Sequence, residues 1–357
     1  MRAIAAVLIV VYHYDIHQIE GVSKVTEVFF GTLWSMVDLF FVLSGFLIAS
    51  GWFKEINRKG SASFKNFYIK RFFRIMPLYY AVILFYWIKN VLIMGREEYN
   101  PLNLILFVQN YIGEMGNFSV SWSLAVEEHF YLLFPLSSLL FLKTLKKEKS
   151  VYIWPALILF ITALRYIKAD QVYEQMQLLD YKASHDLFKK LIYHPTHLRL
   201  DGLLFGVFLA SIRVFKNELW LRLKNYKKEF YFLGGIFLIF SFIFSAQRYE
   251  KAQMAFSFSL MAISFSLLLI PLFHEEFDMK KLGSKLIKHF AKLSYPIYLL
   301  HYPSFYLIDV ILSYLHIENV RGFGNFSFTI LFIYVVSYLA NLLIEEPMLK
   351  LRKKFMQ

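Results

Sequence analysis

Hydrophobic residues in this chain gather into long blocks that are separated by short polar segments. Each block runs for roughly 17–25 residues, the length that a helix needs to cross about 30 Å of hydrocarbon. The stretch from Leu39 to Ile48, for example, is interrupted by Ser44 and Gly45 alone. The pattern predicts an all-α, polytopic transmembrane helix bundle, and we treat residues 1–357 as a single domain with no appended soluble domain.

Counting the blocks gives about ten spans. The first resembles a signal peptide, but it ends in Tyr12-His13-Tyr14 without a small-residue cleavage site, so we expect it to be retained as a membrane helix. Residues 102–111 are apolar but too short to cross, which favours a re-entrant or interfacial helix. Residues 168–196 form the longest predicted external loop. The expected spans are 1–18, 28–52, 75–94, 121–142, 152–168, 197–213, 229–246, 255–273, 293–313 and 326–344.

Charge gives the predicted orientation. The net charge is +13, and 27 of the 39 lysines and arginines fall in Arg2 and in the short segments between alternate blocks. Cytoplasmic loops carry such an excess, so both termini are predicted to be cytoplasmic in a multi-pass membrane protein. A nucleic-acid-binding protein would instead gather its charge on one soluble face, and we expect membrane lipid as a partner and no nucleic acid. The sequence has no cysteine, which excludes a thiol nucleophile.

The first span carries ionisable residues, which are costly within a membrane and are therefore functional candidates. It holds Arg2, His13, Asp15 and His17. Arg2 and His13 are eleven residues apart and share a helical face, with His13 roughly 16 Å along the axis from an arginine expected at the cytoplasmic mouth. A neutral imidazole there can take a proton from an alcohol. The alternative is an interfacial histidine at the outer end of the helix.

Three further spans contribute candidates. Asp38 in the second span could orient His13 or pair with Arg199. Arg71 and Arg74 share a face at the edge of the third span, where guanidinium groups suit phosphate oxygens, although lipid headgroups would explain them equally well. In the fourth span, Glu127 could position a sugar hydroxyl or support the base, or simply be solvated at the interface.

The motifs nearer the C-terminus, taken alone, are typical of structural positions. Tyr298 and His301, three residues apart in the ninth span, are of a kind that most often serves packing and hydrogen bonding. His185 and His194 lie in the predicted external loop.

Taken together, these strings resemble the acyltransferase family 3 membrane proteins, which O-acylate bacterial surface polysaccharides and other exported or membrane-bound acceptors. The matches run in family order along nearly the whole chain. They are Arg2 with His13, Asp38-Leu39-Phe40-Phe41-Val42-Leu43-Ser44-Gly45-Phe46, Arg71-x-x-Arg74-Ile75-x-Pro77, Trp122-Ser123-Leu124-x-x-Glu127 with Phe130-Tyr131, Arg199-x-Asp201, Ser294-Tyr295 through His301, and Glu346-Pro347. Family members usually carry several residues before the first arginine, so we expect either a short first helix or a start upstream of Met1.

The resemblance implies an acyl-CoA donor, usually acetyl-CoA, that arrives from the cytoplasm, and a carbohydrate or lipid-linked glycan acceptor. It implies a catalytic role for His13, with Glu127 and Asp38 in support, and a donor-side or structural role for Arg2, Arg71 and Arg74. It also implies a place in the bacterial cytoplasmic (inner) membrane. Transfer from a thioester to an ester is downhill, so we predict that no metal is needed. The alternative is a proton-coupled transporter, which also uses intramembrane His, Asp and Glu, but we find no inverted repeat that such a protein would show. A non-catalytic membrane scaffold is a second alternative.

Overall fold

The structure is a computed structural model that describes residues 1–14, 29–96, 99–113, 118–144, 147–275, 282–317 and 323–356. Asp15 and His17 of the first predicted span lie outside these residues. Every regular element within the described ranges is helical, which confirms the predicted all-α class.

The helices follow the hydrophobic blocks. The longer ones are α1 (Arg2–His13), α3 (Met36–Lys59), α4 (Phe64–Trp87), α7 (Ser121–Thr144), α9 (Ile153–Met176), α10 (Tyr181–Phe188), α11 (Asp201–Phe215), α13 (Lys227–Ser245), α14 (Lys251–Phe273), α15 (Leu282–Tyr314), α16 (Phe323–Ala340) and α17 (Glu346–Phe355). The short ones are α5 (Leu102–Ile105), α6 (Gln109–Ile112), α8 (Lys147–Ser150), α12 (Asn217–Leu223), the 3-10 turns η2 (Leu33–Ser35), η5 (Thr196–Leu198) and η6 (Lys224–Tyr226), and the π-helical turns η3 (Ile88–Ile93), η4 (Lys189–Tyr193) and η7 (Asn341–Glu345).

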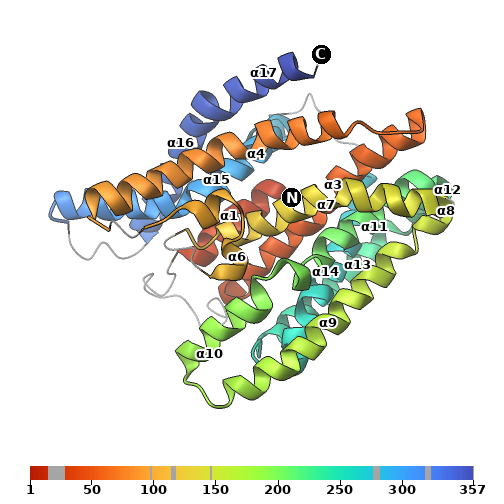
Figure 1. Ribbon diagram of the computed structural model, residues 1–357, viewed down its shortest axis with the longest axis horizontal. Coiled ribbons are helices and arrows are strands. Elements are labelled where there is room, and N and C mark those ends of the chain that lie inside the picture. Colours follow the sequence, from red (N-terminus) through yellow and green to blue (C-terminus); the bar gives the residue numbers. More distant parts are fainter. Residues whose placement is uncertain are drawn as a thin grey trace.

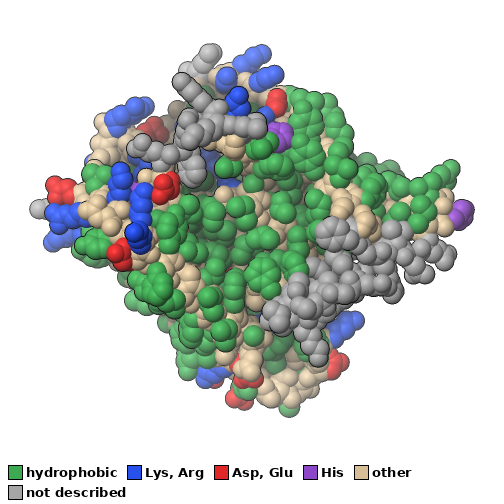
Figure 2. Space-filling model, turned by 180° about the vertical axis from the view of Figure 1, so that it is seen from behind, with side chains coloured by type: hydrophobic (Ala, Val, Ile, Leu, Met, Phe, Trp, Pro, Cys, Tyr) green, Lys and Arg blue, Asp and Glu red, His purple; other side chains and the backbone are tan. Residues whose placement is uncertain are grey.

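Within the described residues, seven helical segments are long and apolar enough to cross a membrane, and they contain α3, α4, α7, α9, α13, α14 and α16. The other three predicted spans coincide with α1, which has 12 residues, with α11, which has 15, and with α15, whose 33 residues do not meet the same hydropathy criterion. The surface agrees with a membrane environment, because hydrophobic side chains cover the middle of the face in Figure 2 and charged ones gather at its margins. The chain is a multi-pass membrane protein.

Several predicted boundaries were wrong. The third span was expected to begin at residue 75, but α4 begins at Phe64, eleven residues earlier, and it contains Arg71 and Arg74, which were expected to share a helical face. Residues 102–111 do not form one interfacial helix; they form the single turns α5 and α6. The predicted loop 168–196 is mostly helical, since α9 continues to Met176 and is followed by α10 and η4.

Helix α1 packs between α3 and α15 with one face buried and the other, which includes Ile4 and Val7, exposed (Figure 1). Its small residues allow this position: Ala5 and Ala6 are fully buried, and Ala6 packs in one cluster with Leu293 and Ile297 of α15. The helix thus carries its polar ends, Arg2 and His13, into the core of the protein.

Helices α3 and α11 cross with their backbones in contact. A Cβ atom on Gly206 would lie 2.2 Å from the carbonyl oxygen of Val42, and one on Gly45 would lie 2.0 Å from the carbonyl oxygen of Leu203. Small residues at such crossings let membrane helices approach closely enough to gain van der Waals contact. This crossing fixes α3, which carries Asp38 and Ser44, against the rest of the bundle.

Candidate active site

His13 and His301 meet in the interior although 288 residues separate them in sequence. His13 Nδ1 lies 3.1 Å from His301 Nε2, and His301 Nδ1 lies 2.7 Å from the carbonyl oxygen of Tyr298. A carbonyl oxygen can only accept, so His301 Nδ1 donates to it, and in a neutral ring His301 Nε2 is then an acceptor. His13 Nδ1 must therefore donate to His301. Neither of these two hydrogen bonds involves His13 Nε2, so neither occupies its lone pair.

A cavity of about 580 Å³ opens beside this pair. Its wall takes residues from the end of α1, from the segments before α3 and α7, from α10 and η4, and from α15. The lining residues are Ile9, Tyr12, His13, Trp34, Val37, Ile112, Gly113, Ser119, Val120, Trp122, His185, Asp186, Phe188, Lys189, Lys190, Tyr193, His194, Arg248, Tyr298 and Tyr302. We call it the outer cavity, since it lies at the end of the bundle that the charge pattern predicts to be external.

A second, smaller cavity of about 50 Å³ adjoins the first, and we call it the inner cavity. Arg2, Ser123, Glu127 and Tyr295 are among the residues that line it, and Tyr298 and Val37 line both cavities. The Tyr298 hydroxyl is hydrogen-bonded to Ser123 Oγ and donates to the carbonyl oxygen of Val120 at 3.1 Å. Tyr298 therefore forms a partition between the two cavities.

A chain of hydrogen bonds holds the inner cavity together. Arg2 Nη2 donates to Ser44 Oγ at 3.1 Å, Ser44 Oγ donates to Glu127 Oε1 at 2.7 Å, and the Tyr131 hydroxyl donates to Glu127 Oε2 at 2.9 Å. Ser44 is fifteen residues from the Lys59 end of α3, or about 22 Å by the helical rise. Arg2 therefore lies beside Ser44, well inside the length of α3, and its position at the cytoplasmic mouth remains a prediction.

Arg71 and Arg74 differ in their partners. Arg74 Nη1 forms an ion pair at 3.3 Å with Glu345, whose side chain is 2% exposed. Arg71 is half-buried and has no hydrogen bond or ion pair within the part of the chain that the structure describes; its electrostatic neighbours include Arg2 and Glu128. Glu128 Oε1 is itself buried without a hydrogen-bond partner among those residues. Arg71 is thus the guanidinium that is available to a ligand.

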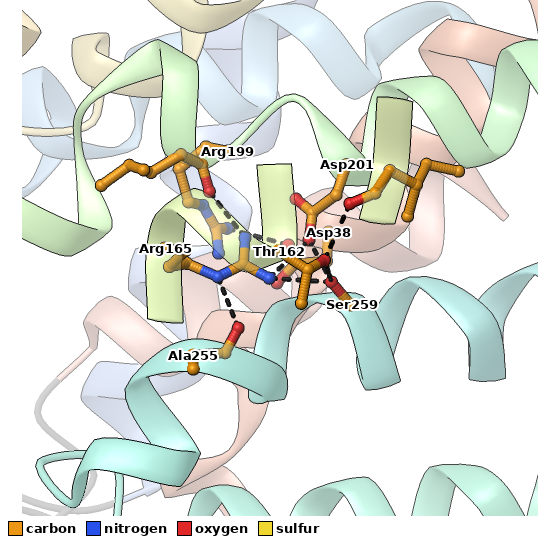
Figure 3. A network of polar contacts seen from close by, with 9 residues as sticks. Asp38, Thr162, Arg165, Arg199, Asp201, Ala255 and Ser259 are labelled. Carbon is orange, nitrogen blue, oxygen red and sulfur yellow. Dashed lines mark hydrogen bonds and ion pairs between the residues drawn. The ribbon is translucent and has the colours of Figure 1, made fainter. Parts of the chain in front are cut away.

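Asp38 pairs with Arg199, the second of the two partners considered for it, and its carboxylate is not among the groups that line either cavity. The Asp38–Arg199 pair at 2.8 Å lies beside an Arg165–Asp201 pair at 2.9 Å, and all four side chains are buried (Figure 3). The network is tied to α14 through Ser259, which donates to Asp201 Oδ2 at 2.7 Å.

The Arg199 guanidinium lies 3.6 Å from the centre of the Phe258 ring and 5.0 Å from that of Tyr193, a residue of the outer cavity. Asp38 therefore contacts the cavity through Arg199 and not through His13.

Two histidines of the outer cavity lie outside the membrane-spanning helices. Burial, together with the positive charges of Lys189 and Arg199, lowers the pKa of His194 to about 3. Burial and Lys189 also lower the pKa of His185, whose Nδ1 lies 2.6 Å from the Tyr249 hydroxyl. His194 is therefore neutral at physiological pH.

Sequence reasoning missed His301 as a partner of His13, although it had recorded the string that contains it. It also missed the cations Lys189, Lys190 and Arg248 at the outer cavity. A predicted loop carries no periodicity that would indicate which of its side chains turn inward, so for these three the sequence offered no signal.

Comparison with known families identifies the chain. A family described as an acyltransferase domain matches residues 1–344. The chain belongs to this acyltransferase family. The resemblance on which the sequence interpretation rested is therefore confirmed, and this acyltransferase carries its paired histidines and its two cavities within the matched region.

Individual relatives are more distant. The acyltransferase is 26% identical to a peptidoglycan O-acetyltransferase of Listeria monocytogenes, in an alignment that covers 98% of this chain and 55% of the relative. It is 29% identical to a Staphylococcus aureus protein whose name assigns it provisionally to the O-acetyltransferases, over 59% of this chain and 34% of that protein. It is 31% identical to an uncharacterized protein of Haemophilus influenzae, over 52% of this chain.

The chain thus spans about half the length of its Listeria relative. No solved structure is detectably similar to it.

Proposed function

We propose that the protein is a membrane O-acetyltransferase of the bacterial cytoplasmic membrane that moves an acetyl group from cytosolic acetyl-CoA to a hydroxyl of a carbohydrate or lipid-linked glycan acceptor. The observation that carries this proposal is the free lone pair of His13 Nε2 beside a cavity of about 580 Å³. A cavity of this size matches the range of small-molecule sites in proteins. The relatives named as O-acetyltransferases support the acetyl group and the hydroxyl acceptor.

The lone pair of His13 serves either of two routes. In direct transfer, Nε2 takes the acceptor hydroxyl proton while the oxygen attacks the thioester carbonyl; the carbon–sulfur bond breaks, and the leaving thiolate receives the proton from the imidazolium. In covalent transfer, Nε2 attacks the carbonyl first, the carbon–sulfur bond breaks and the thiolate leaves. The acyl-imidazolium then passes its acyl group to the acceptor oxygen, which restores the neutral imidazole, and the hydroxyl proton released in this step protonates the thiolate. Acyl label trapped on a His13-containing peptide in the absence of acceptor distinguishes the covalent route.

The donor is proposed to enter from the basic end of the bundle. Arg71, which has no partner among the described residues, is suited to the phosphate groups of CoA, since guanidinium forks bind phosphate oxygens bidentately. Arg74 is held by Glu345 and is assigned a structural role. Arg2, which lines the inner cavity, is proposed to contact the arm that carries the thioester and not the phosphates.

The two carboxylates proposed to support catalysis act at different places. Glu127 accepts from Ser44 and Tyr131 and thereby fixes Arg2 through Ser44, so its role is to shape the inner cavity. Asp38 balances the charge of Arg199, which packs against the wall of the outer cavity. Asp38 is therefore a positioning residue, and His13 is the catalytic residue.

The test compares two histidine variants in sealed membrane vesicles supplied with acetyl-labelled CoA on the cytoplasmic face. His13→Ala should lower transfer to envelope glycan by about 10²–10⁴-fold, the contribution typical of a general base. His289→Ala is the matched control, since His289 lies on α15 and bonds to Tyr334, outside both cavities. A folded His13→Ala protein that still transfers the label would disprove the catalytic role of His13, and a wild-type protein that transfers no label would favour the proton-coupled transporter.

A further inference from the structure

The outer cavity has a strong excess of positive charge. Lys189, Lys190 and Arg248 line it, and Asp186 is the one carboxylate among the lining residues that the structure describes. The cations come from two separate elements, because the lysines begin η4 and Arg248 lies between α13 and α14. Cavities lined by one sign of charge focus the field and concentrate ligands of the opposite sign.

Among the residues that the structure describes, these cations form no ion pair with an acidic group. The side chains of Lys189 and Arg248 are half-buried. The Arg248 guanidinium is 5.8 Å from the centre of the Trp34 ring, and its charge is stabilised by the Tyr12 hydroxyl. Placing charged groups in a half-buried wall without counterions is costly unless a ligand supplies the opposite charge.

Lys189 also lies near the reacting histidine. It is among the charges that act on His13, on His194 and on His185, which together form the cavity wall around it. Lys189 begins the π-helical turn η4, and π-helical turns are frequently found at functional sites. A single substrate molecule would therefore bind Lys189 through an anionic group and present a hydroxyl to His13 Nε2.

We propose that the outer cavity selects an anionic acceptor, a saccharide that carries a carboxylate or a phosphate group, and that Lys189, Lys190 and Arg248 bind this group while His13 faces the acceptor hydroxyl. The inference rests on the proposed function and adds its substrate class. The thioester donor, which also carries phosphates, is assigned to Arg71 at the other end of the bundle, so the two anionic substrates use separate sites.

The first test measures binding without acyl transfer. Hyaluronan tetrasaccharide, which carries carboxylates, is compared with neutral chitotetraose of the same length by the fluorescence of the protein in nanodiscs, where Trp34 and Trp122 line the cavity. The acidic sugar should bind at least tenfold more tightly at low salt, and the difference should shrink at high salt because screening weakens exposed charge interactions. If inorganic pyrophosphate competes with the acidic sugar, phosphate is the preferred anion. If it does not compete, carboxylate is the preferred anion.

Variants that remove either a positive or a negative charge distinguish an electrostatic effect on binding from an effect of misfolding. Lys189→Gln should weaken binding of the acidic sugar by about tenfold, and Asp186→Asn should strengthen it, while both leave chitotetraose unchanged. Lys182→Gln is the control, because Lys182 is an exposed residue of α10 that does not line the cavity. Equal binding of the two sugars, tighter binding of the neutral one or no binding of either would overturn the inference.

The second test measures transfer and keeps the two proposals distinguishable. Lys189→Gln should raise the KM for the acceptor by about tenfold and leave the KM for acetyl-CoA unchanged. If both constants rise together, the cations bind the donor and the inference fails, although the transferase survives. If the acidic sugar binds as expected but the wild type transfers no acetyl group, the proposed function fails instead.

Discussion

At the scale of single residues, the contact between His13 and His301 is the feature on which the proposed chemistry depends. The carbonyl oxygen of Tyr298 fixes one tautomer of His301, and His301 in turn fixes that of His13. Orienting groups of this kind hold the reactive nitrogen of a general base toward its substrate. His301 is therefore a positioning residue whose loss should be felt through His13.

Replacing His301 by Ala should lower kcat by about 10²-fold or more, because His13 loses the acceptor that fixes its ring, while the KM for acetyl-CoA should change little. The measurement is steady-state transfer in vesicles. Added imidazole should restore part of the rate, which a general loss of folding would not allow. A variant with wild-type kcat would contradict the role assigned to His301.

The same substitution should have different effects at the two arginines of α4, Arg71 and Arg74. Arg71→Gln should raise the Kd for acetyl-CoA by about tenfold, since a hydrogen bond to a charged group contributes about 1.5–3 kcal/mol. Arg74→Gln should instead lower stability by about 1–3 kcal/mol, because it leaves the buried Glu345 carboxylate without its partner.

Isothermal titration and thermal unfolding in detergent measure these two effects. The double change Arg74→Gln with Glu345→Gln should recover part of the lost stability. Unchanged CoA affinity in folded Arg71→Gln would rule out the donor-side assignment.

At the scale of elements, the hydrophobic blocks predicted where helices would form better than where they would end. Each of the ten predicted spans falls on a helix, because the length of an apolar block is set by the membrane. The predicted boundaries were wrong where charged residues lie within a helix. Helix α4 begins eleven residues before the predicted start of the span, because the sequence around Lys65, Lys70 and Arg71 is typical of a loop although these residues lie in the helix. The residues of helix α10 were predicted to form a loop for the same reason, because their sequence is polar.

Packing between elements could not be read from the sequence at all. The ion pair of Asp38 with Arg199 was one of two possibilities considered, and nothing in the sequence chose between them. The contacts of His13 with His301 and of Arg74 with Glu345 join residues 288 and 271 positions apart, which no local periodicity reports.

The α3–α11 crossing predicts a steep response to one added methyl group. In Gly206→Ala the new Cβ would meet backbone atoms of Val42 and Phe46 at 2.2 and 2.5 Å, and a backbone clash is not relieved by a rotamer change. Overpacking of this kind costs about 1–3 kcal/mol or more. Thermal unfolding in detergent should show a lower midpoint for Gly206→Ala than for the control Gly235→Ala, whose Cβ meets nothing within 4 Å. Equal midpoints would show that the helices can separate freely.

At the scale of the whole molecule, acid should destabilise the protein partly through His194. Its folded pKa of about 3 lies below the ordinary value of 6.5, so the unfolded chain binds the proton first. The stability that comes from keeping this ring neutral is fully present above pH 6.5 and is lost as the pH falls from there toward 3. Between pH 7.5 and pH 5, the unfolding midpoint of the wild type should therefore fall further than that of His194→Gln. A larger fall in the variant would contradict the assignment.

The partition formed by Tyr298 also bears on the energetics of the cell. Within the part of the chain that the structure describes, Tyr298 lines both cavities and is hydrogen-bonded to Ser123, so we expect its side chain to block a continuous water path between them. Under the proposed function, a neutral acyl group would pass this point while ions would not, and acceptors outside the cell would be modified without loss of the proton gradient. Tyr298→Gly should open this path, and vesicles loaded with a pH-sensitive dye would then lose an imposed gradient faster than vesicles that hold the wild type.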